Sequence, residues 1–176
     1  MKKLLLILIS FVFLTSWMVK LPDEAEKAIA KPKAIYIYNF TKYIEWPAES
    51  KQGNFVVGIL GISPIMISEL SKAVEKNNSK PESRKIEIIN LSSADDVTKC
   101  HIVYILPDNS AQLADVVNKI KSKSTLIVTE KPGMTKQGAG INFVIKDDKL
   151  QFELNKPTIE NHNMKVASGL EALAVH

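Results

Sequence analysis

Cys100 and His101 are adjacent, and they are the residues of this chain whose types come nearest to supporting nucleophilic chemistry. A catalytic thiol needs a nearby base, and that base needs a third group to orient it. The pair opens an apolar run, HIVYIL, that predicts a buried strand, and consecutive side chains of a strand point to opposite faces. The other histidines, His162 and His176, stand isolated in the sequence. We therefore predict no catalytic residues and no enzymatic activity.

The spacing of the other polar residues predicts neither a metal site nor a cofactor. Metal ligands usually cluster at short spacing, whereas the Asp-Asp pairs at 95–96 and 147–148 are typical of turns. The segment from Gly58 to Gly61 lies at the end of a predicted strand and before a predicted helix, but the G-x-G-x-x-G pattern and a phosphate-loop lysine are both missing. A glycine-bearing turn is the simpler interpretation of these two residues.

The composition favours a single globular domain and argues against a nucleic-acid partner. The chain has 176 residues, 45% of them hydrophobic, which suffices for one packed core. Of its 23 basic residues three lie in or beside the N-terminal leader, which leaves 20 against 19 acidic ones. Nucleic-acid binding needs a concentrated basic patch, and none is visible. One cysteine cannot form a disulfide within its own chain.

Residues 1–21 have the anatomy of a bacterial signal peptide. Lys2 and Lys3 form a positive start, and an almost unbroken apolar run covers residues 4–17. The run is shorter than the roughly 20 residues that a membrane span needs. No Ala-x-Ala follows it, so an uncleaved N-terminal anchor is the alternative, and no cysteine follows it that could carry a lipid. We predict export to the periplasm, with residues 22–176 as one domain.

Strands and helices alternate through the middle of the chain. Apolar runs predict strands over residues 55–60, 85–91, 101–106 and 124–129, and a hairpin over 140–145 and 150–154. Helical spacing predicts helices over residues 34–44, after Ser63-Pro64, over the region following 107–110, and over 159–175 with Leu170 and Leu173 on its apolar face. A polar stretch covers 22–33. This order favours an α/β fold with a mostly parallel sheet flanked by helices and an antiparallel edge hairpin.

The segment KAIYIYNFTKYIEWP, residues 33–47, is unusually aromatic. On a helical wheel Tyr36, Phe40 and Tyr43 form one stripe, and a second, aliphatic stripe lies roughly 120° away. A helix with so wide an apolar arc is either enclosed by the core or exposes one stripe to a partner. We predict that the aromatic stripe, together with Trp46, binds a partner. The alternative is that the C-terminal helix covers the stripe.

The same segment resembles the opening signature of the YfiR-like (HmsC-like) family of periplasmic repressors. The later landmarks of that family follow in order: FVVGILG (55–61), CHIVY (100–104), TLIVT (125–129), GAGINF (138–143), FELN (152–155) and SGLEALA (168–174). Two features depart from the family pattern. Some members carry paired cysteines where this chain has only Cys100, and GLE at 169–171 is more polar than the usual leucine pair.

The resemblance implies a non-enzymatic α/β domain that forms a homodimer. It also implies a repressor that binds the periplasmic region of a membrane-bound diguanylate cyclase and thereby lowers cyclic-di-GMP and biofilm formation. An outer-membrane lipoprotein can sequester such repressors, and related domains occur with sensor histidine kinases.

A second hypothesis is a periplasmic domain that senses a small molecule and acts with a membrane histidine kinase. Its site would lie beyond the carboxyl ends of the parallel strands, where open α/β sheets bind ligands. We predict the loop residues of such a site as Gly61, Lys131, Gly138, Gly140 and Asn142. A deep pocket with convergent polar groups would distinguish this hypothesis from a repressor that relies on an apolar contact surface.

Overall fold

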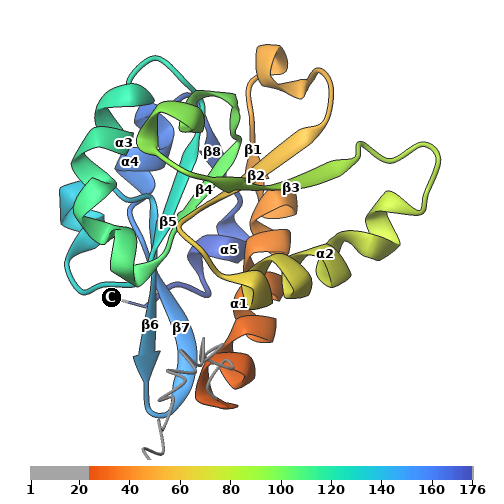
Figure 1. Cartoon of the computed structure of the whole chain (residues 1–176). Helices are drawn as coiled ribbons and strands as arrows, with labels where there is room; N and C mark the ends of the chain where they lie inside the picture. Colours follow the sequence, from red (N-terminus) through yellow and green to blue (C-terminus); the bar gives the residue numbers. More distant parts are fainter. Residues whose placement is uncertain (1–23, 176) are drawn as a thin grey trace, which may run out of the picture.

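A six-stranded sheet forms the centre of the protein in a computed structural model that describes residues 24–175 (Figure 1). In spatial order its strands are β3 (Ile86–Leu91), β2 (Phe55–Leu60), β4 (Ile102–Ile105), β5 (Leu126–Thr129), β6 (Ile141–Lys146) and β7 (Lys149–Leu154). The first five are parallel, and β7 pairs antiparallel with β6. The predicted fold class is therefore confirmed. The predicted leader lies outside the described residues.

Helices cover both faces of this sheet (Figure 1). On one face α1 (Glu24–Tyr43) and α2 (Pro64–Asn78) pack over the larger apolar core. On the other face η2 (Ala94–Lys99) and α3 (Leu113–Lys119) enclose a second core. The shorter elements are β1 (Ile44–Glu45), η1 (Ala48–Lys51), η3 (Pro107–Gln112), η4 (Met134–Gln137), α4 (Lys156–Asn161), β8 (Lys165–Val166) and α5 (Ser168–Glu171). Within residues 24–175 no helix has both the length and the apolar character to cross a membrane.

Helix α1 is longer than predicted, because it includes much of the stretch that was expected to be irregular. Pro32 lies inside the helix, where proline normally costs stability since it lacks an N–H and crowds the preceding turn. Ala30 and Lys33, on either side of it, are both nearly inaccessible to solvent. Packing of this half of the helix therefore outweighs the local cost of the proline. At its other end α1 stops at Tyr43, close to the predicted end.

The C-terminal region is not the single helix predicted over residues 159–175. It divides into α4, β8 and α5, and β8 pairs antiparallel with β1. Asn163 adopts φ 58°, a left-handed conformation that ends the helical path. Leu170 is buried, whereas Leu173 is 64% exposed, so the prediction of one apolar face carrying both residues is wrong.

The β6–β7 hairpin matches its prediction. The two residues of its tip, Asp147 and Asp148, have φ of 51° and 55°. Two successive left-handed residues are the geometry of a two-residue turn whose twist suits the flanking strands. The hairpin brings Phe143 and Phe152 opposite each other in register, and both rings are buried.

Candidate functional site

The order of the strands places a crevice at one edge of the sheet. From β2 the chain runs through α2 to β3 on one side, and it later enters β4 on the other side of β2. The connections that follow β2 and β4 therefore diverge to opposite faces of the sheet. In open α/β sheets this arrangement leaves a crevice beyond the carboxyl ends of the two strands, and ligands bind there.

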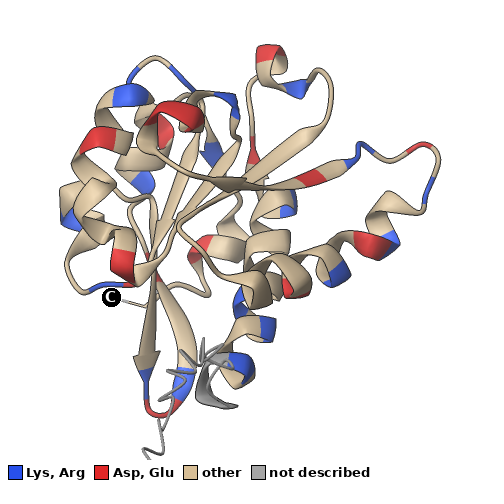
Figure 2. Cartoon of the chain, in the orientation of Figure 1, with Lys and Arg blue, Asp and Glu red and all other residues tan. Residues whose placement is uncertain are grey.

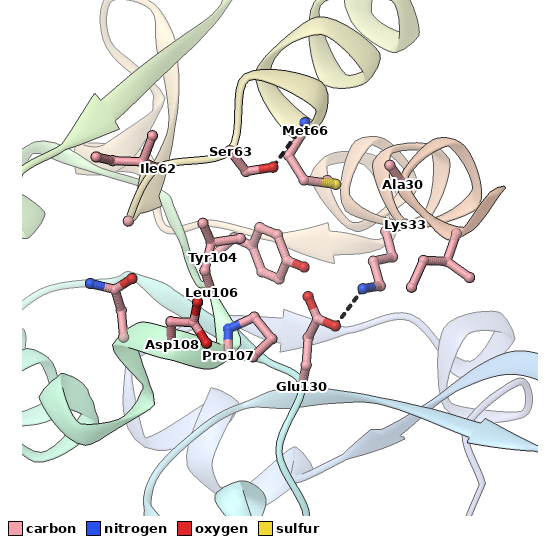
Figure 3. Close-up of a pocket in the computed structure, with 13 residues that line it drawn as sticks. Ala30, Lys33, Ile62, Ser63, Met66, Tyr104, Leu106, Pro107, Asp108 and Glu130 are labelled. Atoms are coloured by element: carbon pink, nitrogen blue, oxygen red, sulfur yellow. Dashed lines mark hydrogen bonds and ion pairs between the residues drawn. The ribbon is translucent and has the colours of Figure 1, made fainter. Parts of the chain in front are cut away.

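A cavity of about 640 Å³ occupies this crevice (Figure 3). Four segments that are distant in sequence line it: one face of α1, the loop between β2 and α2, the loop after β4, and Glu130 directly after β5. Its volume falls within the range of about 300–1,000 Å³ that is usual for small-molecule sites. The cavity lies at the edge of the sheet that the small-molecule hypothesis named, and ligand binding there stays a prediction.

Local sequence features shape the loop between β2 and α2. Gly61 has φ 116°, and a Cβ atom there would lie 2.2 Å from the Oδ1 atom of Asn109. Only glycine therefore allows the two loops to approach so closely. Ser63 begins α2 as predicted, since its hydroxyl accepts a hydrogen bond from the Met66 N–H at 3.3 Å and Pro64 takes the first helical position.

The cavity wall carries one buried ion pair and, besides Ser63, the buried hydroxyl-bearing side chain of Tyr104. The Lys33 ammonium donates a hydrogen bond to Glu130, and both side chains are largely shielded from solvent. Tyr104 is 1% exposed, and its ring packs edge-on against Phe143 with 6.2 Å between centroids. Its hydroxyl points into the cavity (Figure 3). The carboxylate of Asp108 lies across the cavity, in the first turn of η3.

Only one of the five predicted loop residues lines this cavity. Gly61 does, whereas Lys131, Gly138, Gly140 and Asn142 do not. A Cβ on Gly138 would contact Val117 at 2.8 Å. A Cβ on Gly140 would lie 2.8 Å from Leu126 and 2.9 Å from Ile159. These two glycines therefore permit close packing beneath η4.

Asn142 has a structural role in the sheet. Its Oδ1 accepts a hydrogen bond from the Thr129 hydroxyl at 2.8 Å, and its Nδ2 donates to Glu153 at 3.2 Å. The side chain is fully buried. It joins β5, β6 and β7 at the edge of the sheet and is not directed to the cavity.

Sequence reasoning missed the polar groups that do line the cavity. Lys33 lies three residues after buried Ala30 and four before buried Ile37, so helical spacing places it on the apolar face, which it interrupts. Glu130 directly follows a buried strand, which places it at the carboxyl edge of the sheet. Tyr104 lies within a fully apolar strand, and no local pattern distinguishes it from a core residue.

Most of the aromatic stripe predicted to bind a partner lies in the core. Phe40 is 0% exposed and Trp46 4%. The Phe40 ring packs at 5.5 Å from Phe152 and 6.1 Å from Phe143, and partly buried Tyr36 joins the same cluster at 5.5 Å from Phe152. The expectation that Phe40 and Trp46 lie on the surface is therefore wrong.

The element that covers the stripe is the β6–β7 hairpin, not a C-terminal helix. Of the predicted stripe, Tyr43 remains on the surface, with 47% of its area exposed. Its partner-binding role stays a prediction.

The Cys100–His101 pair is divided between the two faces of the sheet, as predicted. Cys100 belongs to the core under α3, and burial raises the pKa of its thiol to about 12. The His101 ring stacks on Phe55 on the other side, at 4.6 Å between centroids. The backbone N–H of Val56 donates to its Nδ1 at 3.0 Å, so the neutral ring carries its proton on Nε2. Burial lowers the pKa of His101 below its ordinary value.

Charged groups elsewhere form no second constellation in the described part of the chain. No three His, Cys, Asp or Glu residues among residues 24–175 come together as metal ligands. Figure 2 shows acidic and basic residues mixed along α2 and on the helices of the opposite face, while the strands are mostly uncharged. This distribution agrees with the near-neutral balance of the sequence and does not form a basic stripe of the kind that nucleic acid requires.

The fold and its crevice define a doubly wound α/β domain with a ligand-sized cavity at the switch point of the sheet. A family model described as YfiR/HmsC-like matches residues 30–175, and the chain belongs to this family. The family is one of periplasmic, non-enzymatic regulators. A comparison with curated proteins finds no match to this chain.

Proposed function

We propose that this protein is a periplasmic signalling repressor that binds the periplasmic sensor region of a membrane-bound diguanylate cyclase and lowers cyclic-di-GMP output. Membership of the YfiR/HmsC-like family over residues 30–175 is the observation that carries the proposal. The separation of Cys100 from His101 by the sheet supports a role in binding rather than in catalysis. An outer-membrane lipoprotein that sequesters the repressor fits the same scheme.

The solvent-facing side of α1 is the surface that we assign to the partner. Ile35 and Tyr43 are 46% and 47% exposed, unusually high for apolar residues on a helix whose other side is core. Lys42 lies between them on the same face, with its ammonium 3.9 Å from the centre of the Tyr38 ring. Aromatic residues on an exposed helix contribute strongly to contacts with partners, because they bury a large area at little entropic cost.

The partner surface is tested by measuring association and stability on the same variants. Tyr43→Ala should weaken binding to the purified periplasmic region of the cyclase at least tenfold while leaving the melting temperature nearly unchanged. Tyr36→Ala is the matched control, because its ring packs in the aromatic cluster and its loss should lower stability. Unchanged cyclase binding by Tyr43→Ala would remove this face of α1 from the proposal. A homodimer that dissociates on the same substitution would assign the face to a second copy.

The regulatory output is tested in the producing bacterium. Deletion of the gene should raise cyclic-di-GMP and biofilm mass, and the wild-type gene supplied in trans should restore both. The Tyr43→Ala gene should restore them only in part, whereas a Lys72→Ala gene, altered at an exposed position of α2, should restore them fully. Unchanged cyclic-di-GMP after deletion would refute repression of a cyclase.

A second candidate function is a small-molecule sensor that acts with a membrane histidine kinase. The cavity beyond β2 and β4 is the specific observation that favours it. Both functions are compatible, because a ligand that binds one conformer better shifts the affinity for a partner.

A further inference from the structure

The hydroxyl of Tyr104 is a polar group at the end of a buried side chain, and it has no hydrogen-bond partner among residues 27–175. The residue is 1% exposed, and its hydroxyl forms no hydrogen bond with a side chain or backbone group of residues 27–175. Among the described residues the enclosed side-chain atom without a hydrogen-bond partner is Gln151 Oε1, so the Tyr104 hydroxyl is reached by solvent through the cavity. The hydroxyl faces the cavity (Figure 3), where it can form a hydrogen bond with a bound molecule.

Among the charged side chains around the cavity, one carboxylate has no ion-pair partner in the described part of the chain. Lys33 and Glu130 neutralise each other. Asp108, which lines the cavity at its exposed rim, forms neither an ion pair nor a side-chain hydrogen bond with residues 27–175. The charged and hydroxyl groups left without a partner at the cavity are thus a carboxylate, which only accepts hydrogen bonds, and a hydroxyl, which accepts as well as donates; the Asn109 amide lines the cavity beside them.

The rest of the wall is mostly apolar, with Ser63 and Asn109 as its further polar side chains. Ala30 and Met66 face the cavity from α1 and α2, and Leu106 and Pro107 face it from the segment after β4. A ligand must therefore combine an apolar body with one strongly donating group. An anion is disfavoured because it would lie beside Asp108 and Glu130, and because the Ser63 hydroxyl already takes the Met66 N–H at the start of α2.

We propose that this cavity binds a small primary amine with an apolar body. A protonated amine has three donors: one reaches the Asp108 carboxylate and another the Tyr104 hydroxyl oxygen, while the apolar body lies against Ala30 and Met66. The proposal deepens the second candidate function by giving the chemical class of the ligand. Its test uses purified protein without any cyclase or kinase. A failure to bind amines is therefore distinguishable from a failure of the proposed signalling functions.

The experiment is calorimetric titration of the full chain at pH 7 with butylamine, cyclohexylamine and 2-phenylethylamine, each compared with the alcohol of the same skeleton. At least one amine should bind, and its alcohol should bind at least tenfold more weakly, because a neutral hydroxyl cannot form a charge-assisted bond with Asp108. Equal binding of an amine and its alcohol, or no binding by any of the amines, overturns the proposal.

Two nearly isosteric variants assign the contacts. Asp108→Asn should raise the dissociation constant of the best amine at least tenfold, and Tyr104→Phe should raise it about threefold or more. Asp148→Asn, at the tip of the β6–β7 hairpin, is the matched control and should change nothing, since asparagine tolerates the left-handed backbone found there. Melting curves check that all variants fold, and amine affinity that is unchanged in both folded cavity variants overturns the assignment.

Discussion

Replacement of Phe40 by alanine tests whether the aromatic stripe of α1 is core or surface. The ring is 0% exposed, and it packs against Tyr36, Phe143 and Phe152 with centroids 6.3, 6.1 and 5.5 Å away. Removing a buried phenylalanine side chain costs about 3–5 kcal/mol, and each aromatic pair contributes about 0.5–1.5 kcal/mol beyond its buried area. With three such pairs we expect a loss of about 4 kcal/mol for Phe40→Ala.

The assay is equilibrium unfolding in urea, supported by thermal melting. For a domain of this size each kcal/mol shifts the melting temperature by roughly 2–4 °C, so about 4 kcal/mol lowers it by about 8–16 °C. Phe40→Leu keeps part of the packing and should lose less, about 1–2 kcal/mol. Tyr43→Ala, half-exposed on the same helix, should stay within about 0.5 kcal/mol of the wild type. A loss below about 1 kcal/mol for Phe40→Ala would refute the core assignment.

Four further predictions concern other parts of the chain. Because burial lowers the pKa of His101 below 6.5 in the folded state, the unfolded state binds more protons. Stability should therefore fall as the pH drops below about 6.5, and His101→Gln should flatten that decline in urea titrations. Cys100, with its thiol pKa raised to about 12, should resist Ellman's reagent at pH 8 until the protein is unfolded, and reductant should leave the melting curve unchanged. Gly58→Ala should destabilise by about 1–3 kcal/mol in the same unfolding assay, because its Cβ would lie 2.6 Å from Leu91. Mass spectrometry of periplasmic extracts should find the chain without residues 1–21, whereas an intact N-terminus in the membrane fraction would indicate an anchor.

The strands were predictable because the signal that marks them is local. A run of β-branched and apolar residues specifies a buried strand whatever lies elsewhere in the chain. The run FVVGIL matches β2 residue for residue, and the start of α2 at Ser63-Pro64 follows from capping chemistry within four residues. Alternation of side chains also predicted correctly that Cys100 and His101 separate.

The helices at both ends of the chain show where local signals fail. Pro32 and polar neighbours predicted no helix before residue 34, yet burial of Ala30 and Lys33 extends α1 to Glu24. Helical spacing after residue 159 predicted one helix. Residues 165–166 instead form β8, which pairs with β1, a strand more than a hundred residues earlier in the chain. In both cases a long-range contact outweighed the local preference, as packing commonly does.

The sequence by itself determined the α/β class and the order of the strands along the chain. Tertiary structure alone decided which face of α1 is buried, because the covering hairpin lies about a hundred residues away. It also decided which side chains line the cavity, since Lys33, Tyr104, Asp108 and Glu130 come from separate segments. Periodicity reports only that a side chain is apolar or polar along its own element. Which other element it meets depends on how the sheet is wound, and that is a property of the whole chain.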